Sequence, residues 1–567
     1  MEKRALIAAV LMAALLLAYQ MFFFPVPQEP PAPKPSPQTA TPAVPPAAPA
    51  APAAPVTRRP AAPRSPQRLA TVETPLYRAV VSSEGGKLQE LVLKYRGEKP
   101  MVILGDLGPA GLLIAPDARQ SPTVVPMALS TERIAVGPER PTQDLVLTGD
   151  VDGLHVRQTL TVRADDFAID VSLRVENDAG APRTVTIALP WLTRQAWHAT
   201  QEKFQGQHPT EIVWSSAGQI KRIEDLTAVV EQVADGEWIA VGSVWYLAAL
   251  VPETPGFKLV ATSEGKPPEP KNGDNAPAGR ASIALRASPT IQPGQAWEGR
   301  ALLYAGPKEY DRLSAHGLEG SVNFGCFPLP CEIKGVPTPS IPMRWLGVPI
   351  LLLMNWVYKY VGNYGLAIIL LTVVTRVLFY PLTVKSMRSM KAMQALQPQV
   401  NALRNKYKSD PQRLQKETLE LYRKHKVNPM GGCLPMFAQI PIFYGLYLAL
   451  SVSVELQNAK FLCIARLFGI DFWICDLAAH DPTYVLPILM GITMFIQQKM
   501  TPTAGDPRQA KMMLVMPFVF TFMFLNLPSG LVLYWTVSNI LQIAQQWWMN
   551  RPARERAGRE AKDAGRA

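Results

Sequence analysis

The sequence predicts a multi-domain membrane protein, in which an all-β sandwich lies between an N-terminal anchor helix and an α-helical bundle of five core transmembrane helices. Apolar runs of membrane length occur at 5–24 and repeatedly after residue 345. Between them, short runs alternate apolar and polar residues with period two, which is typical of strands. The mean hydropathy of +0.05 conceals this division, because the apolar residues are concentrated in separate segments.

The first 67 residues predict an anchor and a tether. Within residues 1–24, the apolar run Ala5–Phe24 would form a helix of about 30 Å, which matches the hydrocarbon thickness of a bilayer. Its aromatic C-terminal end makes a poor cleavage region, so we interpret it as an uncleaved transmembrane anchor. Lys3 and Arg4 precede it and place the N-terminus in the cytoplasm. Residues 25–67 are Pro/Ala-rich and predict an extended linker on the other side of the membrane.

Residues 68–335 predict an all-β sandwich outside the cytoplasm. Turn residues separate its alternating runs, and the apolar segment 238–252 is interpreted as buried strands. No catalytic set, metal-ligand spacing or cofactor motif emerges, so we expect no metal site and no cofactor. Two cysteine pairs lie in segments predicted outside the cytoplasm, where disulfides can form: Cys326 with Cys331, and Cys463 with Cys475.

The membrane region begins with an interfacial amphipathic helix at 343–362, rich in Trp and Tyr. It could instead be a span, but that would place the basic segment after residue 384 outside the cytoplasm.

The transmembrane core occupies 363–550, and we expect Pro381 to end or kink its first helix. Two neighbouring spans, 484–498 and 512–527, are short at about 22–24 Å and would imply local thinning of the bilayer. The expected core spans are 364–382, 434–454, 484–498, 512–527 and 530–549, with both chain termini cytoplasmic.

A cytoplasmic helical hairpin is predicted at 384–427, where eleven basic residues stand against three acidic ones. Asp410 and Pro411 are suited to the N-cap and first position of its second helix. A methionine face could contact apolar peptide, although packing between the two hairpin helices is the alternative. The basic hairpin and the basic tail 551–567 could bind ribosomal RNA or anionic lipid, or could act only as topology signals. The candidate contact residues of the hairpin are Met387, Met390, Met393, Lys385 and Arg388.

Arg376 is the central candidate, because it lies inside an apolar run and its guanidinium stays charged. Placing it at membrane depth costs roughly 2.5–3.5 kcal/mol on insertion scales. Snorkelling toward the nearer membrane surface is one explanation. However, no Asp or Glu lies inside any predicted core span, so the charge is either hydrated or available to an acidic group of another molecule. Other polar candidates on the core helices are Thr372 and Tyr380 on the face of Arg376, with Gln439, Trp535, Ser538 and Asn539 on other spans.

Four core segments resemble the YidC/Oxa/Alb family of membrane-protein insertases, in its Gram-negative form with a large periplasmic domain. They are 361–387 (VGNYGLAIILLTVVTRVLFYPLTVKSM), 427–447 (VNPMGGCLPMFAQIPIFYGLY), 481–502 (DPTYVLPILMGITMFIQQKMTP) and 527–539 (LPSGLVLYWTVSN). In the β domain, 84–93 (EGGKLQELVL) is the clearest match. The resemblance implies a β-supersandwich similar to sugar mutarotases, although fold similarity does not imply that activity.

The resemblance implies a non-enzymatic insertase and foldase of the cell inner membrane, with residues 25–342 periplasmic. It would insert nascent membrane proteins without ATP, alone or with the Sec translocon, through a hydrophilic groove that carries Arg376. Thr372 and Trp535 would contact the substrate, although relatives often carry Tyr at the second position. Membrane lipids and the ribosome are further expected partners, and no specific DNA is expected. An anion transporter that uses Arg376, or an anchored glycan-binding protein, are the alternatives from other functional classes.

Overall fold

The computed structural model describes residues 67–564 apart from several internal segments. The predicted anchor 1–24 and nearly all of the linker 25–67 therefore lie outside the described residues. The internal segments not described are 96–97, 104–110, 118–119, 196–210, 225, 227–228, 266–278, 328–331, 334–335, 338–340, 408–409, 426, 428–433, 468–469 and 501–506.

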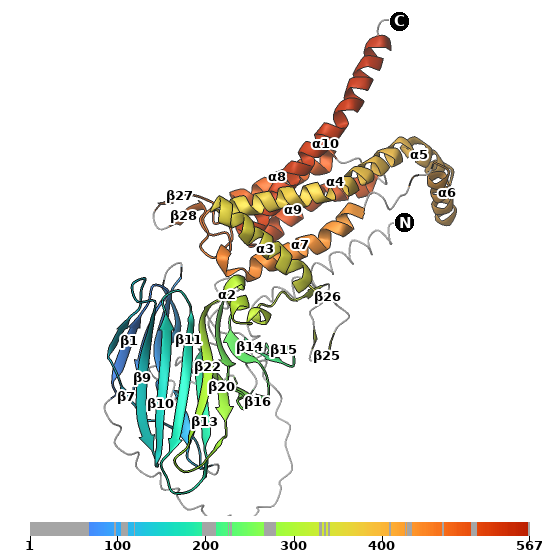
Figure 1. The fold of residues 1–567 in the computed structure, drawn as a ribbon. Coiled ribbons are helices and arrows are strands. Elements are labelled where there is room, and N and C mark those ends of the chain that lie inside the picture. The colour runs from blue at the N-terminus through green and yellow to red at the C-terminus, as the bar shows by residue number, and fades with distance from the viewer. Residues whose placement is uncertain are drawn as a thin grey trace, which may run out of the picture. The chain divides into compact units, whose positions relative to one another are not determined.

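The β domain is built on a nine-stranded antiparallel sheet, and Figure 1 shows several of its long strands side by side. Sequential hairpins join β9, β10 and β11, and β22 returns from later in the chain to pair with both β11 and β18. In spatial order the sheet contains β15 (Gln219–Ile223), β14 (Glu211–Ser216), β17 (Trp238–Gly242), β18 (Tyr246–Pro252), β22 (Ala296–Pro307), β11 (Ala168–Asn177), β10 (Leu154–Arg163), β9 (Thr142–Val151) and β7 (Ala128–Leu129).

A six-stranded sheet packs against the nine-stranded one, with β20 contacting β17 and β18, and β19 contacting β17. A five-stranded sheet completes the domain, and its β1 pairs with β8 in parallel. The six-stranded sheet has the order β16 (Val229–Ala234), β19 (Lys258–Glu264), β20 (Gly279–Ala287), β13 (Thr186–Gln195), β5 (Leu113–Ala115) and β6 (Thr123–Val124). The five-stranded sheet has the order β4 (Glu98–Ile103), β3 (Leu88–Lys94), β2 (Tyr77–Ser82), β1 (Leu69–Glu73) and β8 (Arg133–Ala135).

Short ribbons and helical turns connect the larger elements. The two-stranded ribbons are β12 (Arg183–Thr184) with β21 (Thr290–Ile291), β23 (Cys326–Phe327) with β26 (Ile341–Pro342), β24 (Glu332–Ile333) with β25 (Val336–Pro337), and β27 (Leu462–Leu467) with β28 (Ile470–Ile474). The short helices are α2 (Tyr310–Ala315) and the 3₁₀ turns η1 (Glu319–Ser321) and η3 (Val454–Leu456).

The period-two pattern of the sequence explains the strands. Along β10 every second residue, from Leu154 to Val162, is buried, because successive side chains point to opposite faces of the sheet. The predicted buried pair 238–252 is confirmed, since all five residues of β17 and the first five of β18 are buried. Strands buried on both faces read as continuous apolar runs, which is why this segment lacks alternation.

The C-terminal half is helical, and its core helices contact one another in several pairs, among them α4 with α10, α8 with α10, and α8 with α9. The predicted interfacial segment forms a helix, α3, whose position in a membrane stays a prediction. In chain order the helices are α3 (Arg344–Val361), α4 (Tyr364–Ala395), α5 (Gln397–Lys406), α6 (Pro411–Lys424), α7 (Leu434–Val452), α8 (Val485–Met500), α9 (Pro507–Phe524) and α10 (Ser529–Ala564).

The first alternative for Pro381, an end of the helix, is wrong, because α4 continues through this residue to Ala395, and the other alternative, a kink, stays a prediction. Proline removes one backbone hydrogen bond, but the bonds on either side of it keep the helix continuous. The first arm of the hairpin is instead divided at Leu396, where α4 ends and α5 begins with Pro398 in its first turn. The predicted boundary between span and hairpin at 382–384 is therefore no helix boundary.

The second arm of the hairpin begins as predicted. The side chain of Asp410 accepts a hydrogen bond from the backbone nitrogen of Arg413 at 3.0 Å, and Pro411 opens α6. An N-cap side chain satisfies one of the four backbone donors that a helix leaves free, so these two residues fix where α6 starts.

Large apolar side chains are exposed on several core helices. Val377 and Leu378 on α4 are 68% and 70% exposed, and Phe522 on α9 is 76% exposed. Contiguous apolar surface of this kind is unfavourable in water and suits hydrocarbon. By length and composition, the 32-residue helix α4 can cross a bilayer. Shorter apolar helical stretches in the described part of the chain are Ile440–Val452, Val485–Met500 and Leu514–Phe524.

The helix in the predicted span 484–498 is short, since α8 has 16 residues and measures about 24 Å; that it crosses a membrane stays a prediction. The boundary predicted for the next span differs, because α9 begins at Pro507 and not at Met512. Its first residues are polar and basic, so hydropathy did not reveal that they are helical. The number of spans in the core stays a prediction.

A buried ion cluster holds one end of the β domain together. Glu211 on β14 lies 3.1 Å from the Nζ of Lys308 and 2.8 Å from Nη1 of Arg222 on β15. The two cations also donate to the backbone oxygens of Ser321 and Gly320 in η1. Burial raises the pKa of Glu211, but the charges of Lys308 and Arg222 outweigh it, so that its pKa lies below the usual value. The carboxylate of Glu211 is therefore charged inside the domain. The stability of the folded domain then requires its two cationic partners.

Replacing Lys308 with Met should destabilise the β domain by about 3–5 kcal/mol, because it removes one partner of a buried charge. The matched control is Lys258→Met, which removes an exposed cation 3.7 Å from Asp235 and should cost less than about 1 kcal/mol. Hydrogen exchange on the full chain would report the opening free energy of β14 and β22 in both variants. Equal protection in the two variants would contradict a structural role for the cluster.

The stability of the β domain should fall as the pH falls below about 4.5, the ordinary pKa of a glutamate. The folded-state pKa of Glu211 is lowered, so its contribution is present above the unfolded-state pKa and is lost as the carboxylate is protonated. Urea unfolding of the full chain between pH 6 and pH 3 measures the slope. Glu211→Gln should flatten this slope, and an unchanged slope would show that other carboxylates produce it.

Candidate functional site

Arg376 lies near the middle of α4, on a turn whose other residues are largely apolar. Its Nε donates to the hydroxyl oxygen of Ser538 on α10 at 3.1 Å, and its Nη2 donates to the same oxygen. Ser538 itself is buried, at 5% exposure. Among the described residues, no carboxylate pairs with Arg376. The guanidinium is thus held by a neutral hydroxyl, which orients the charge without neutralising it.

The last core helix, α10, is also bound to α8 through amide side chains. Asn539 donates to Thr493 Oγ1 at 3.3 Å, and Gln546 donates to the backbone oxygen of Met500 at 2.7 Å. Asn539 and Gln546 are both buried. The neighbouring residues Ser538 and Asn539 therefore hold α10 against two different helices, α4 and α8.

Trp535 lies in an aromatic cluster between three helices. Its ring centroid is 4.5 Å from that of Phe443 on α7, 5.1 Å from Phe524 on α9 and 6.2 Å from Phe520 on α9. Two of these pairs are edge-to-face, an arrangement that aromatic quadrupoles favour. The three phenylalanines were not among the sequence candidates, because an apolar residue in an apolar span carries no signal of its own.

The two other candidates on the face of Arg376 differ from each other. Thr372 is fully buried, and its hydroxyl donates to the backbone oxygen of Ile368 at 2.7 Å. Tyr380 is 52% exposed. Sharing one helical face does not give residues the same surroundings, because α4 is covered at Thr372 and uncovered one turn beyond Arg376. The side chain of Gln439 lies outside the described residues.

The hairpin candidates lie on the last turns of α4 and not on a separate helix. Met387 is buried, Met390 and Met393 are partly exposed, and the cations Lys385 and Arg388 are exposed. The methionines are thus at least partly covered by other parts of the protein, whereas the two cations lie at the surface. A contact that the sequence did not indicate is Lys391 Nζ, which donates to the backbone oxygen of Met549 on α10 at 3.0 Å.

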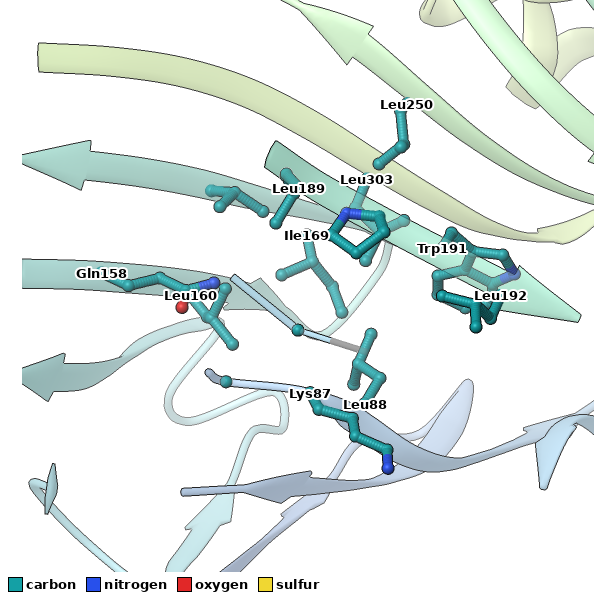
Figure 2. A pocket seen from close by; sticks show the side chains of 14 residues that line it. Lys87, Leu88, Gln158, Leu160, Ile169, Leu189, Trp191, Leu192, Leu250 and Leu303 are labelled. Atoms are coloured by element: carbon teal, nitrogen blue, oxygen red, sulfur yellow. The ribbon is translucent and has the colours of Figure 1, made fainter. Parts of the chain in front are cut away.

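A second candidate is a cavity of about 40 Å³ inside the β domain, where all three large sheets meet (Figure 2). Its walls are mostly leucine, isoleucine and valine, with Trp191 at one side. Gln158 lines it, is 1% exposed, and its Oε1 has no hydrogen-bond partner. This volume holds about three water molecules, which fits an ordered water on Gln158 better than a sugar ring.

Replacing Trp535 with Ala should destabilise the helical core by about 2–4 kcal/mol, because it leaves the rings of Phe443 and Phe524 facing a void. Trp548→Ala, a control on the same helix at 71% exposure, should change stability by less than about 0.5 kcal/mol. Thermal unfolding in detergent, followed by helix content, compares them. Equal melting temperatures would contradict the packing role of Trp535.

Comparison with known proteins covers both halves of the chain. The family model described as 60Kd inner membrane protein matches residues 356–556, and the model described as YidC periplasmic domain matches residues 69–329. A membrane protein insertase YidC of Syntrophus aciditrophicus is 37% identical over 98% of this chain and 100% of its own length. Another, of Maridesulfovibrio salexigens, is 36% identical over 97% of this chain and 99% of its own.

Among solved structures, the active YidC insertase with its first transmembrane domain resolved is similar at a TM-score of 0.35 and 18% identity, covering 85% of this chain and 95% of that one. The full-length relatives carry the assignment, since identity above one third extends over nearly the whole of both chains. The chain therefore belongs to the YidC family of membrane protein insertases.

Proposed function

We propose that this chain inserts nascent membrane proteins into the cell inner membrane, and that Arg376 receives acidic groups of the inserting segment. The observation that carries the proposal is the bonding of Arg376, which goes to the hydroxyl of Ser538 and, among the described residues, to no carboxylate. A charge in apolar surroundings that is oriented but not neutralised attracts a passing carboxylate strongly, because the local dielectric is low.

In this mechanism an acidic or polar tail pauses at Arg376 in a hydrophilic groove, while the adjoining apolar segment moves into lipid. The exposed apolar faces of α4 and α9 support this route, because they suit both lipid and an apolar segment. The short α8 supports local thinning of the bilayer, which lowers the cost of moving a polar tail across. No covalent step and no ATP hydrolysis is required.

We further propose the topology and partners that the family resemblance implies. Both termini would be cytoplasmic and residues 25–342 periplasmic, with five core spans and an anchor. The exposed cations Lys385 and Arg388, with the basic hairpin, suit a ribosome or anionic lipid surface. The Sec translocon would be a further partner. Thr372, Tyr380, Gln439, Trp535 and Asn539 remain proposed groove residues.

Arg376→Ala should lower the insertion of an acidic-tailed substrate into reconstituted vesicles by at least about tenfold, the equivalent of about 1.4 kcal/mol. Arg376→Lys should retain most of the activity, because charge matters more here than the shape of the guanidinium. Lys359→Ala is the control, since that cation is exposed on α3 and lies 3.9 Å from Asp311.

Protease protection of the translocated tail measures insertion in these vesicles. Normal insertion by Arg376→Ala would refute the proposed role of the arginine. Uptake of small anions that depends on Arg376 and needs no nascent chain would instead indicate a transporter.

A further inference from the structure

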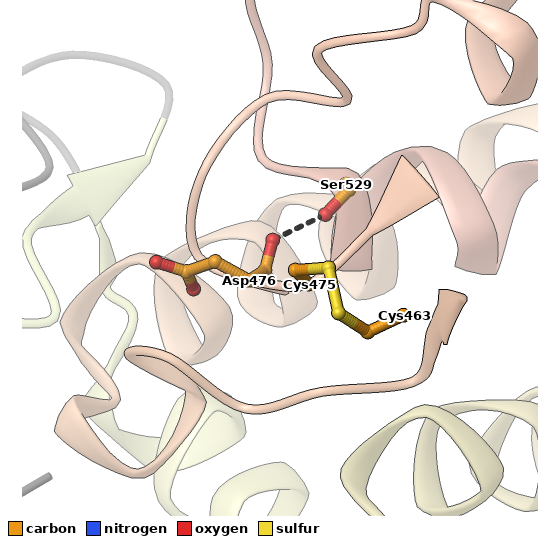
Figure 3. Close-up of a disulfide and its surroundings, with 4 residues drawn as sticks. All are labelled: Cys463, Cys475, Asp476 and Ser529. Atoms are coloured by element: carbon orange, nitrogen blue, oxygen red, sulfur yellow. Dashed lines mark hydrogen bonds between the residues drawn. A yellow bond between two sulfur atoms is a disulfide. The ribbon is translucent and has the colours of Figure 1, made fainter. Parts of the chain in front are cut away.

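A disulfide between Cys463 and Cys475 closes the β27–β28 hairpin, which lies between α7 and α8 (Figure 3). The sequence left this pairing open, and the structure confirms it. Cys326 is also disulfide-bonded, and its expected partner, Cys331, lies outside the described residues. The surroundings of the Cys463–Cys475 bond connect it with the two helices that carry Arg376 and Ser538.

The chain just before Cys463 lies on the first turn of α4. Asn363, the N-cap of α4, donates from Nδ2 to the backbone oxygen of Lys460 at 3.3 Å. Phe461 packs directly on Gly365, where an added Cβ would lie 2.1 Å from the ring. Only glycine permits so close an approach, so α4 is seated against this segment.

The chain just after Cys475 holds the first turn of α10. The Oγ of Ser529 donates to the backbone oxygen of Asp476 at 2.8 Å, which Figure 3 shows beside the disulfide. The backbone nitrogens of Ser529 and Gly530 donate to the oxygens of Ala479 at 2.7 Å and Leu477 at 2.9 Å. The beginning of α10 is thus fixed to residues that directly follow Cys475.

Hydrogen bonds and the disulfide join these two segments, and one of the hydrogen bonds runs from Asn458 N to the Oδ1 of Asp476 at 3.0 Å. Phe461 N donates to the oxygen of Ile474 at 3.2 Å, and Leu477 N donates to that of Ala459 at 3.1 Å. A two-stranded ribbon of this size is marginally stable by itself. The covalent bond prevents the two segments from separating when the backbone bonds open.

We propose that Cys463 and Cys475 are positioning residues, which hold α4 against α10 and thereby fix Arg376 against Ser538. Arg376 lies about 16 Å along α4 from Gly365, and Ser538 lies about 12 Å along α10 from Gly530. If the segments beside Cys463 and Cys475 separate, the two helices can tilt apart over these distances. The guanidinium of Arg376 then moves away from the hydroxyl of Ser538. The positioning of Arg376 by the disulfide does not depend on the proposed function. Only the expected effect on insertion rests on that function.

The test is a double-mutant cycle with Cys463→Ser/Cys475→Ser and Arg376→Ala, assayed by vesicle insertion of an acidic-tailed substrate. With Arg376 present, loss of the disulfide should slow insertion by roughly three- to tenfold. With Arg376→Ala, the same loss should have little further effect, because its action passes through the arginine. Cys326→Ser, which removes the other disulfide, is the control and should leave insertion unchanged.

An equal slowing in both backgrounds would overturn the proposal and leave the disulfide as a staple of general stability. An unchanged rate with Arg376 present would overturn it as well. If the serine pair does not fold, a dithiol can be added to the folded, reconstituted chain. The dithiol supplies two electrons and two protons, the sulfur–sulfur bond breaks into two thiols, and the reagent closes to its own disulfide.

A spectroscopic measurement separates this proposal from the function it serves. Spin labels on unnatural residues at Val377 of α4 and Ile540 of α10, both exposed, report the distance between the helices. Reduction should broaden that distance distribution, and an unchanged distribution would overturn the positioning role. This result holds even if Arg376→Ala inserts normally, an outcome that would refute only the proposed function.

Discussion

The helical half of this protein depends on one energetic constraint, a permanent charge at Arg376 inside an apolar helix. The neighbouring helix α10 provides Ser538, whose buried oxygen accepts two hydrogen bonds from the guanidinium. A carboxylate at that place would cancel the charge, whereas a hydroxyl only orients it. The packing of α4 on α10 therefore determines where the charge lies. It also determines that the partner of the charge is a neutral hydroxyl.

The other contacts of α10 keep this helix in place. Asn539 and Gln546 bind α8, Trp535 packs against α7 and α9, and the first turn is fixed beside Cys475. Each contact uses hydrogen bonds or closely packed aromatic rings, which can join helices where burial of apolar surface from water supplies no driving force. This explains why the polar residues of the last span serve the junctions between helices as well as the proposed groove.

The β domain obeys a different constraint, since its layers are held by apolar burial. Alternation along β10 and continuous apolar runs in β17 and β18 follow directly from one-sided and two-sided burial, so both were readable from the sequence. Its charged cluster was not, because Lys308 is 97 residues from Glu211 in the chain and all three charged residues resemble ordinary surface residues in the sequence. Only the folded sheets bring them into one buried position.

The sequence by itself determined the classes of element, the charge at Arg376 and its lack of an acidic neighbour along the core spans. These follow from local composition and periodicity. Tertiary structure decided that α4 continues through Pro381, that Thr372 is covered while Tyr380 is exposed, and that Ser538 is the partner of Arg376. It also decided that Cys463 pairs with Cys475 between two helix ends. Such features depend on which distant segments meet, and helical periodicity specifies a face without specifying its neighbour.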